Sequence, residues 1–256
     1  MSEADLFDTG SLAYEQGDYS RAIDCFEQLI RNEPSAEAWL LLAECHAESG
    51  AGKKAYECLK KGLAAFPQDM DLLFALGDYY FETGADEQAL QIYQQIIDQH
   101  PQEAEALVCK AMVLMNQKKI EAATAVCQDA LQIQPDMIFA LNALGDIYSH
   151  QGRLAEAIGL YRQATTLDPE DAQPLLNLAD ALYEDGKLEE AEQCCLKGLA
   201  LDSGMTMGYF LLGSICLDQD RTREAVEYFE QFLRLEKSPS AEELRKEVAA
   251  VLEGLK

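Results

Sequence analysis

A repeat with a period of 34 residues constrains the fold of this 256-residue chain more than any other feature. Seven alanines follow one another at steps of 33 or 34 residues: Ala22, Ala55, Ala89, Ala123, Ala157, Ala191 and Ala225. Five prolines keep the same step: Pro34, Pro67, Pro101, Pro135 and Pro169. A period of this length is typical of architectures in which one small module stacks on the next. The alanines therefore predict seven copies of such a module.

Each copy is predicted to form two helices. In the fifth copy, apolar residues at 140, 141, 144, 147 and 148 recur at helical spacing, and a second apolar stripe runs from Leu154 to Ala164. Gly152 lies in the turn between them, and Pro169 closes the copy because proline cannot continue a helix. One helix pair cannot bury its apolar face alone, so the copies must stack.

The residues of each copy resemble the tetratricopeptide repeat (TPR) family. The fifth copy carries that family's pattern in order: Leu141, Leu144-Gly145, Tyr148, Ala157, Tyr161 and Pro169. The resemblance implies an all-α fold, a right-handed TPR superhelix (α-solenoid) of seven helix-turn-helix repeats in a single domain, 1–256. The predicted repeats span 3–35, 36–69, 70–103, 104–137, 138–171, 172–205 and 206–239.

A capping helix is predicted over residues 240–255. Ser240 and Glu243 resemble a capping box, and Leu244, Val248, Val251 and Leu255 form an apolar stripe. A terminal repeat needs a partner with a polar outer face, which such a helix supplies. The alternative is a detachable tail that docks elsewhere.

The fourth copy departs most from the pattern. Lys110 stands where Leu is expected, Lys118 where Gly is expected and Cys127 where an aromatic residue is expected. The fourth repeat is therefore predicted to be the weakest.

Charge and composition exclude several classes of partner. Lys and Arg number 20 and Asp and Glu 46, which gives a formal net charge of −26. Such a charge repels nucleic acid and anionic membrane surfaces. The acidic start at Glu3 and Asp5 does not resemble a secretory signal, and no apolar run is long enough to cross a membrane. We expect a cytoplasmic protein with no membrane insertion.

Catalytic, metal-binding and cofactor-binding motifs are not found in the sequence. His46, His100 and His150 fall in three different repeats, and no pair of the eight cysteines has CxxC spacing. Cys127 and Cys195 stand where other repeats have tyrosine, which predicts small buried side chains. We expect no enzyme activity, no metal and no cofactor.

The family resemblance implies that the first helices of the repeats line a concave groove. Its predicted contact residues are Phe7, Tyr14, Glu44, Glu48, Asp71, Phe74, Asp78, Phe81, Glu82, Met112, Met115, Phe139, Asn142, Asp146, Asn177, Asp180, Tyr183 and Phe210. No Lys or Arg occurs at these positions, and most basic residues lie on second helices and turns. This disfavours the family's clamp for a partner's C-terminal carboxylate. It favours a scaffold that binds a basic, partly apolar protein segment through carboxylates and aromatic rings.

Other interpretations remain open. The carboxylates could simply be solvated, and the aromatic rings could pack between helices. The chain could instead self-assemble as a structural homo-oligomer, or act as a regulatory or chaperone-like subunit of a larger complex.

Overall fold

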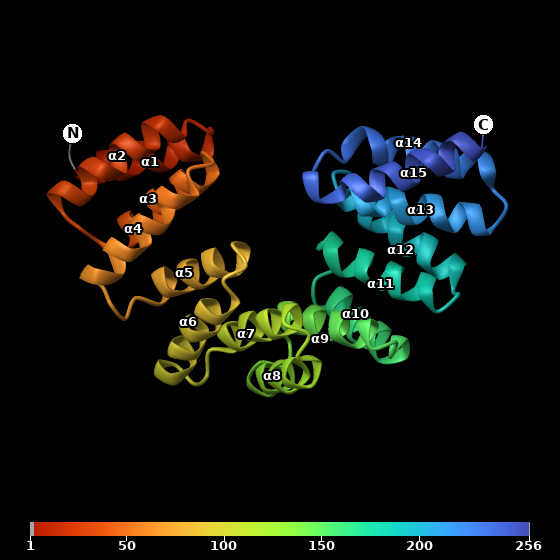
Figure 1. The fold of residues 1–256 in the computed structure, drawn as a ribbon, viewed down its shortest axis with the longest axis horizontal. Coiled ribbons are helices and arrows are strands. Elements are labelled where there is room, and N and C mark those ends of the chain that lie inside the picture. Colours follow the sequence, from red (N-terminus) through yellow and green to blue (C-terminus); the bar gives the residue numbers. More distant parts are fainter. Residues whose placement is uncertain (1–2, 256) are drawn as a thin grey trace. The chain divides into compact units, whose positions relative to one another are not determined.

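The computed structural model describes residues 3–255, and these form fifteen α-helices, one 3-10 helix and no strand (Figure 1). The chain divides into two compact units, Met1–Lys119 and Ile120–Lys256. None of the described helices is long and apolar enough to span a membrane.

The first unit contains seven helices: α1 (Glu3–Glu15), α2 (Tyr19–Asn32), α3 (Ala36–Glu48), α4 (Gly52–Ala65), α5 (Met70–Glu82), α6 (Asp86–Gln99) and α7 (Ala104–Asn116). Each helix packs against the next along the chain, and α3 also packs against α5. The odd-numbered helices are the first helices of the predicted repeats and the even-numbered ones are the second. Their stacking in sequence order buries two apolar clusters, one centred on α2 to α4 and the other on α5 to α7.

The second unit contains the remaining helices: α8 (Ile120–Ile133), α9 (Ile138–His150), α10 (Leu154–Leu167), α11 (Ala172–Glu184), α12 (Leu188–Leu201), α13 (Thr206–Asp218), α14 (Thr222–Leu235), the 3-10 helix η1 (Pro239–Ala241) and α15 (Glu242–Leu255). Here too each α-helix packs against the next, while α11 also contacts the first helices on either side of it, α9 and α13.

Several first helices begin at a side-chain cap. Ser35 Oγ accepts a hydrogen bond from the Ala38 amide at 3.2 Å, and Asp69 Oδ1 accepts one from the Leu72 amide at 3.0 Å. These caps satisfy amides that have no partner inside the helix. The sequence thus sets where these first helices start.

The two helices of a repeat meet where a glycine on the first faces an aromatic ring on the second. A Cβ atom added to Gly145 would lie 2.5 Å from Tyr161 Cε1, and one added to Gly77 would lie 2.6 Å from Tyr93 Cε1. The aromatic residue follows the glycine by sixteen positions. Repeats with alanine at the glycine position have a smaller side chain sixteen residues later, as in the pair Ala179 and Cys195. The size of one side chain therefore limits the size of the other.

The C-terminal helix differs from the prediction in its start and its buried face. It begins at Glu242, after Pro239–Ala241 has formed a 3-10 turn, and the Ser240 hydroxyl donates to Ser238 Oγ at 3.2 Å instead of capping the helix. The predicted capping box is therefore wrong, because the proline starts a tight turn at that position. Val248 and Leu252 are buried against α14, whereas Val251, which was predicted in the apolar stripe, is exposed.

We expect Gly145→Ala to destabilise the protein by about 1–3 kcal/mol, because the added methyl group overpacks the contact with Tyr161. Gly159→Ala in the adjacent helix α10 is the matched control. A Cβ there meets nothing within 4 Å, so alanine's higher helix propensity should stabilise the protein by about 1 kcal/mol. Chemical denaturation of both variants measures the difference, and equal effects would contradict the packing argument.

Lys118 has the backbone conformation that glycine has in other repeats. Its φ is 59°, while that of Gly152 at the matching turn is 71°. A left-handed backbone is strained for lysine, so Lys118→Gly should stabilise the protein by about 1 kcal/mol. Lys119→Gly removes the same charge from a residue whose φ is not positive, so it should not increase the stability of the protein. Thermal unfolding would test this, and a gain of equal size in both variants would argue against strain.

Candidate functional site

In the first unit, the predicted groove residues of α1 and α3 lie close together. Glu44 is half-buried, and burial followed by the charge of Glu48 raises the pKa of its carboxyl. Burial, Glu44 and Glu48 together raise the pKa of the Tyr14 hydroxyl on α1. Phe7 is half-buried and its ring meets Phe26 edge-on, with centroids 6.4 Å apart. This end of the unit thus combines two carboxylates with a phenol and a partly exposed ring.

A tyrosine from a second helix reaches the predicted groove residues of α5. Tyr93 Oη donates to Asp78 Oδ1 at 2.6 Å, and the Phe74 ring lies 6.5 Å from the Tyr93 ring. Glu105 on α7 adds a further carboxyl whose pKa is raised by burial and then by Glu103, Asp78 and Asp71. The remaining predicted residues here are half-buried or exposed: Phe81, Glu82, Met112 and Met115.

In the second unit, a chain of hydrogen bonds links α9, α10 and α11. Asp146 Oδ1 accepts hydrogen bonds from Tyr161 Oη at 2.6 Å and from Asn177 Nδ2 at 3.5 Å. Gln173 Nε2 in turn donates to Asn177 Oδ1 at 2.7 Å. Desolvation raises the pKa of Asp146, although the Tyr161 hydroxyl and His150 act to lower it. The groove side chains of these helices therefore hold one another in place.

Asp180 on α11 differs from Asp146 because no described residue donates a hydrogen bond to its carboxylate. In its repeat, Cys195 occupies the place of the tyrosine, so the hydroxyl that would reach the carboxylate is missing. Burial, then Glu184 and Asp146, raise the pKa of Asp180. Burial beside two further carboxyls therefore makes ionisation of Asp180 less favourable than that of an exposed aspartate, and a positive charge placed next to it would favour the ionised form.

A cavity of about 430 Å³ opens beside Asp180 between α11 and α13. Its polar lining comes from Gln173, Asn177, Asp180 and Thr206, and its apolar lining includes Leu176, Met205, Met207, Phe210 and Leu211. The Phe210 ring also packs on Phe232, with centroids 5.7 Å apart. No Lys or Arg lines the cavity.

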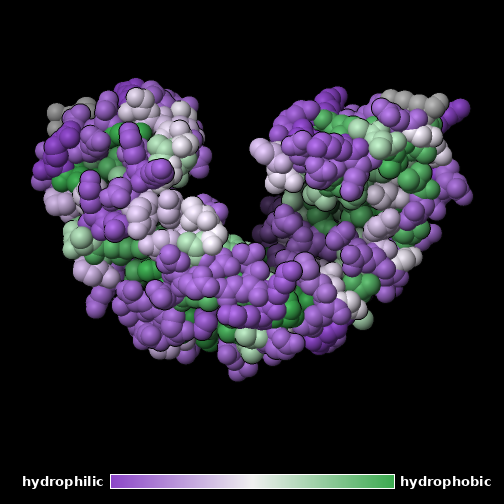
Figure 2. Space-filling model, in the orientation of Figure 1, coloured by the Kyte–Doolittle hydropathy of each residue, from purple (hydrophilic) through white to green (hydrophobic). Residues whose placement is uncertain are grey.

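The remaining predicted groove residues of the second unit lie apart from that cavity. The Tyr183 hydroxyl donates a hydrogen bond to Asp218 Oδ2 at 2.8 Å, and the Phe139 side chain is 40% exposed. Asn142 Oδ1 is buried and accepts no hydrogen bond from any described residue. On the face seen in Figure 2, hydrophilic residues cover most of each unit and hydrophobic residues form small patches.

Sequence reasoning missed the tyrosine–aspartate hydrogen bonds and the contribution of Glu105. The fifteen-residue spacing shared by Asp78–Tyr93 and Asp146–Tyr161 was the available signal. The spacing also identifies the exception at Asp180 and Cys195. Glu105 carries no such signal, because its burial depends on neighbouring helices.

The cysteines and histidines form no recognisable catalytic or metal centre. Cys127 and Cys195 are fully buried, and burial raises the pKa of each thiol to about 12, which confirms the prediction of small buried side chains. His46 is also buried. Among the described residues, no group of three or more His, Cys, Asp and Glu side chains is arranged to hold a metal ion.

Comparison with known proteins identifies the repeat. Family models described as tetratricopeptide repeats match residues 7–138, 175–201 and 208–239, and one described as TPR repeat matches residues 145–186. No curated protein matches the chain significantly.

Solved structures share the fold. A tetratricopeptide repeat protein from Parabacteroides merdae superposes with a TM-score of 0.76 at 19% identity, covering 99% of this chain and 98% of that one. Yeast Tom70 superposes with a TM-score of 0.76 at 18% identity, covering 99% of this chain and 53% of that one. The APC/C hetero-tetramer Cut9-Hcn1 superposes with a TM-score of 0.75 at 17% identity, covering 93% of this chain and 48% of that one. The chain thus spans about half the length of the latter two. These matches confirm the predicted all-α TPR fold.

The groove carboxyls predict how stability depends on pH. Glu44, Glu105, Asp146 and Asp180 have raised pKa values in the folded chain, so folding favours their protonated forms. The lowered pKa of His46 acts in the opposite direction below pH 6.5, but it is one group against four, so the melting temperature should rise from pH 8 to about pH 5. Hydrogen bonds from Thr206 and Ser238 lower the pKa of Glu236 to about 2. Its stabilisation is lost below its ordinary pKa, near 4.5, so the melting temperature should fall again in acid.

Differential scanning calorimetry across this pH range measures the profile. The double variant Glu105→Gln and Asp180→Asn should flatten the rise between pH 8 and pH 5. A melting temperature that decreases steadily from pH 8 downward would contradict the assignment.

Proposed function

The chain belongs to the tetratricopeptide repeat family, and we propose that it is a non-catalytic interaction scaffold whose first helices bind a basic, partly apolar protein segment. Family membership supports a protein-interaction scaffold in general. The chemistry of the bound segment is inferred from the groove side chains of each unit.

The unpaired Asp180 beside an apolar cavity is the observation that carries this proposal. Its carboxylate has no donor from the described residues and lies near two further carboxyls. A lysine or arginine from a partner would supply the missing cation and donor together. An ionised donor paired with an ionised acceptor gives a stronger hydrogen bond than two neutral groups.

The apolar lining of the same cavity matches the rest of such a side chain. Lys and Arg carry apolar stems that pack on hydrophobic surface while their charged ends stay near a polar group. Phe210, Met207 and Leu176 offer that surface next to Asp180. A segment with an additional leucine or phenylalanine would bury more apolar area here, at about 25 cal/mol per Å².

The first unit supports the same preference. Glu44 and Glu48 adjoin Tyr14, while Asp71, Asp78 and Glu105 adjoin Phe74 and the Tyr93 hydroxyl. Carboxylates of this kind steer a basic partner and fix its register, while the rings contribute burial and cation–π contacts. Because solvent and salt screen exposed charges, we expect modest affinity that decreases as ionic strength rises.

Fluorescence anisotropy with labelled ten-residue peptides tests the proposal. A peptide alternating Lys and Leu should bind the full chain at low salt, and a peptide alternating Glu and Leu should not. Asp180→Asn should weaken binding about threefold to tenfold, corresponding to loss of one charge-assisted contact. Because a bound cation requires ionised Asp180, wild-type affinity should also fall as the pH drops through the raised pKa of this carboxyl.

Glu189→Gln is the matched control, since it removes the same charge from an exposed site on the second helix of the same repeat. It should leave affinity nearly unchanged. Equal weakening by both variants would reduce the effect to net charge, and equal binding of basic and acidic peptides would refute the proposed specificity.

A further inference from the structure

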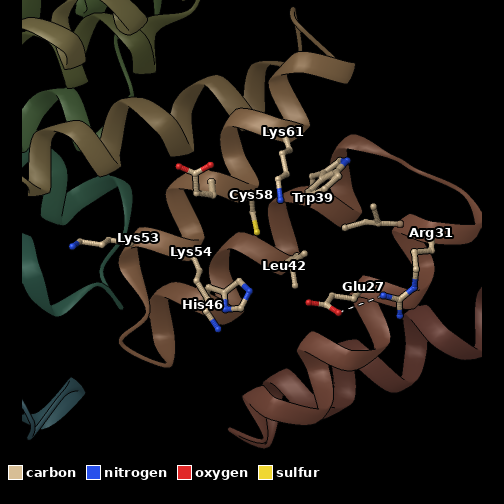
Figure 3. A pocket seen from close by; sticks show the side chains of 11 residues that line it. Glu27, Arg31, Trp39, Leu42, His46, Lys53, Lys54, Cys58 and Lys61 are labelled. Carbon is tan, nitrogen blue, oxygen red and sulfur yellow. Dashed lines mark ion pairs between the residues drawn. The ribbon is translucent and has the colours of Figure 1, made fainter.

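A second cavity, of about 560 Å³, lies in the first unit on helices α2, α3 and α4 (Figure 3). Helix α3 contributes Trp39, Leu42 and His46 to it, which follow one another at helical spacing. Glu44 and Glu48, which belong to the groove, fall on the opposite side of the same helix at about 100° per residue. The cavity is therefore separate from the groove.

The middle of this cavity is apolar. Figure 3 shows Leu42 and Cys58 between two polar ends, one with Lys61 beside Trp39 and the other with Lys54 beside His46. The cavity volume falls within the range of about 300–1,000 Å³ that is typical of ligand sites. It can accept one apolar side chain from a partner.

Cations surround that apolar centre, in contrast to the rest of this acidic chain. Four cations, Arg31, Lys53, Lys54 and Lys61, and two carboxylates, Glu27 and Glu57, line the cavity, a net charge of +2 in a chain of net charge −26.

The lysines of the cavity are available to a partner. Arg31 pairs with Glu27 at 3.5 Å, but none of Lys53, Lys54 and Lys61 has a carboxylate of the described residues within ion-pair distance. An exposed lysine without a fixed partner can form an ion pair without first breaking one.

His46 and Trp39 add polar groups to the cavity wall. Only 6% of the His46 surface is exposed, and its imidazole forms no hydrogen bond with any described residue, but its ring nitrogens stay accessible from the cavity. Burial and the charge of Lys54 lower its pKa, so the ring is neutral near pH 7 and has one donor and one acceptor nitrogen. The Trp39 indole Nε1–H is buried and donates to no described residue, and because buried polar groups normally have partners, this unpaired donor at the cavity wall indicates a ligand.

The spacing of the lysines indicates how long that ligand is. Lys54 and Lys61 are seven residues apart on α4, which places them on one face about 10 Å apart. A single phosphate or carboxylate would have to draw both lysine side chains away from the opposite ends of the cavity that they occupy in Figure 3. A peptide segment with two or more carboxylates can pair with each lysine where it lies, with an apolar side chain between them.

We propose that this cavity binds an acidic protein segment, which places one apolar side chain against Trp39 and Leu42 and pairs its carboxylates with Lys54 and Lys61. The scaffold then has two binding surfaces of opposite preference. A basic segment binds to the first helices and an acidic one binds between α2 and α4.

Trp39 is the only tryptophan of the chain, so its fluorescence reports on the cavity directly. The probe is a ten-residue peptide with Glu residues on both sides of a central Leu and no tryptophan. Titration into the full chain should change the emission in a saturable manner. Lys54→Gln combined with Lys61→Gln should weaken binding at least tenfold, because both charge pairs are lost.

Lys60→Gln combined with Lys197→Gln is the matched control. Lys60 is on the same helix but its ammonium lies over the Tyr56 ring at 5.3 Å, and neither lysine lines the cavity. The control and the groove variant Asp180→Asn should both bind like the unmodified chain. Equal weakening by the two double variants would overturn the proposal, as would the absence of any emission change.

Two further titrations separate this site from a general anion site. Replacing the central Leu of the peptide by Ser should weaken binding several-fold, and inorganic phosphate at the same concentration should leave the emission unchanged. A Ser peptide that binds equally well, or phosphate that reproduces the emission change, would overturn the proposal.

Discussion

The fit between a small residue on a first helix and the side chain sixteen residues later on the second helix is the packing contact on which the fold depends. A methyl group at Gly145 would collide with the Tyr161 ring, so the two helices can pack this closely only if this position has no side chain. The same ring donates its hydroxyl to Asp146. One side chain therefore sets the helix spacing and also holds in place a carboxylate that belongs to the proposed groove.

Loss of that ring changes the site as well as the packing. Where Cys195 replaces the tyrosine, the neighbouring helix can carry Ala179 instead of glycine, and Asp180 is left without a hydroxyl donor. This unpaired carboxylate lines a cavity. The residue that we propose to bind a partner's cation is thus one at which the repeat pattern fails.

Helical periodicity also explains how one repeat can present two surfaces of opposite charge. Groove and cavity residues of α3 alternate around a single helix, so Glu44 and His46 face different directions although they are two residues apart. Because the basic residues are mostly on second helices, cations gather on the side away from the groove carboxylates. The net charge of −26 is a sum over the whole chain and does not reveal that acidic and basic residues lie on different sides of the helices.

The sequence by itself determined the repeat period, the all-α fold and the set of first-helix positions, because these depend on spacing along the chain and on stacking between neighbours. It did not determine which carboxylates have partners, since Tyr161 meets Asp146 only after two helices have packed. It also placed Ser240 in a helix cap that Pro239 prevents. The basic cavity was decided by tertiary structure alone: Arg31, His46 and Lys61 come from three helices, and only packing brings their side chains around one hollow.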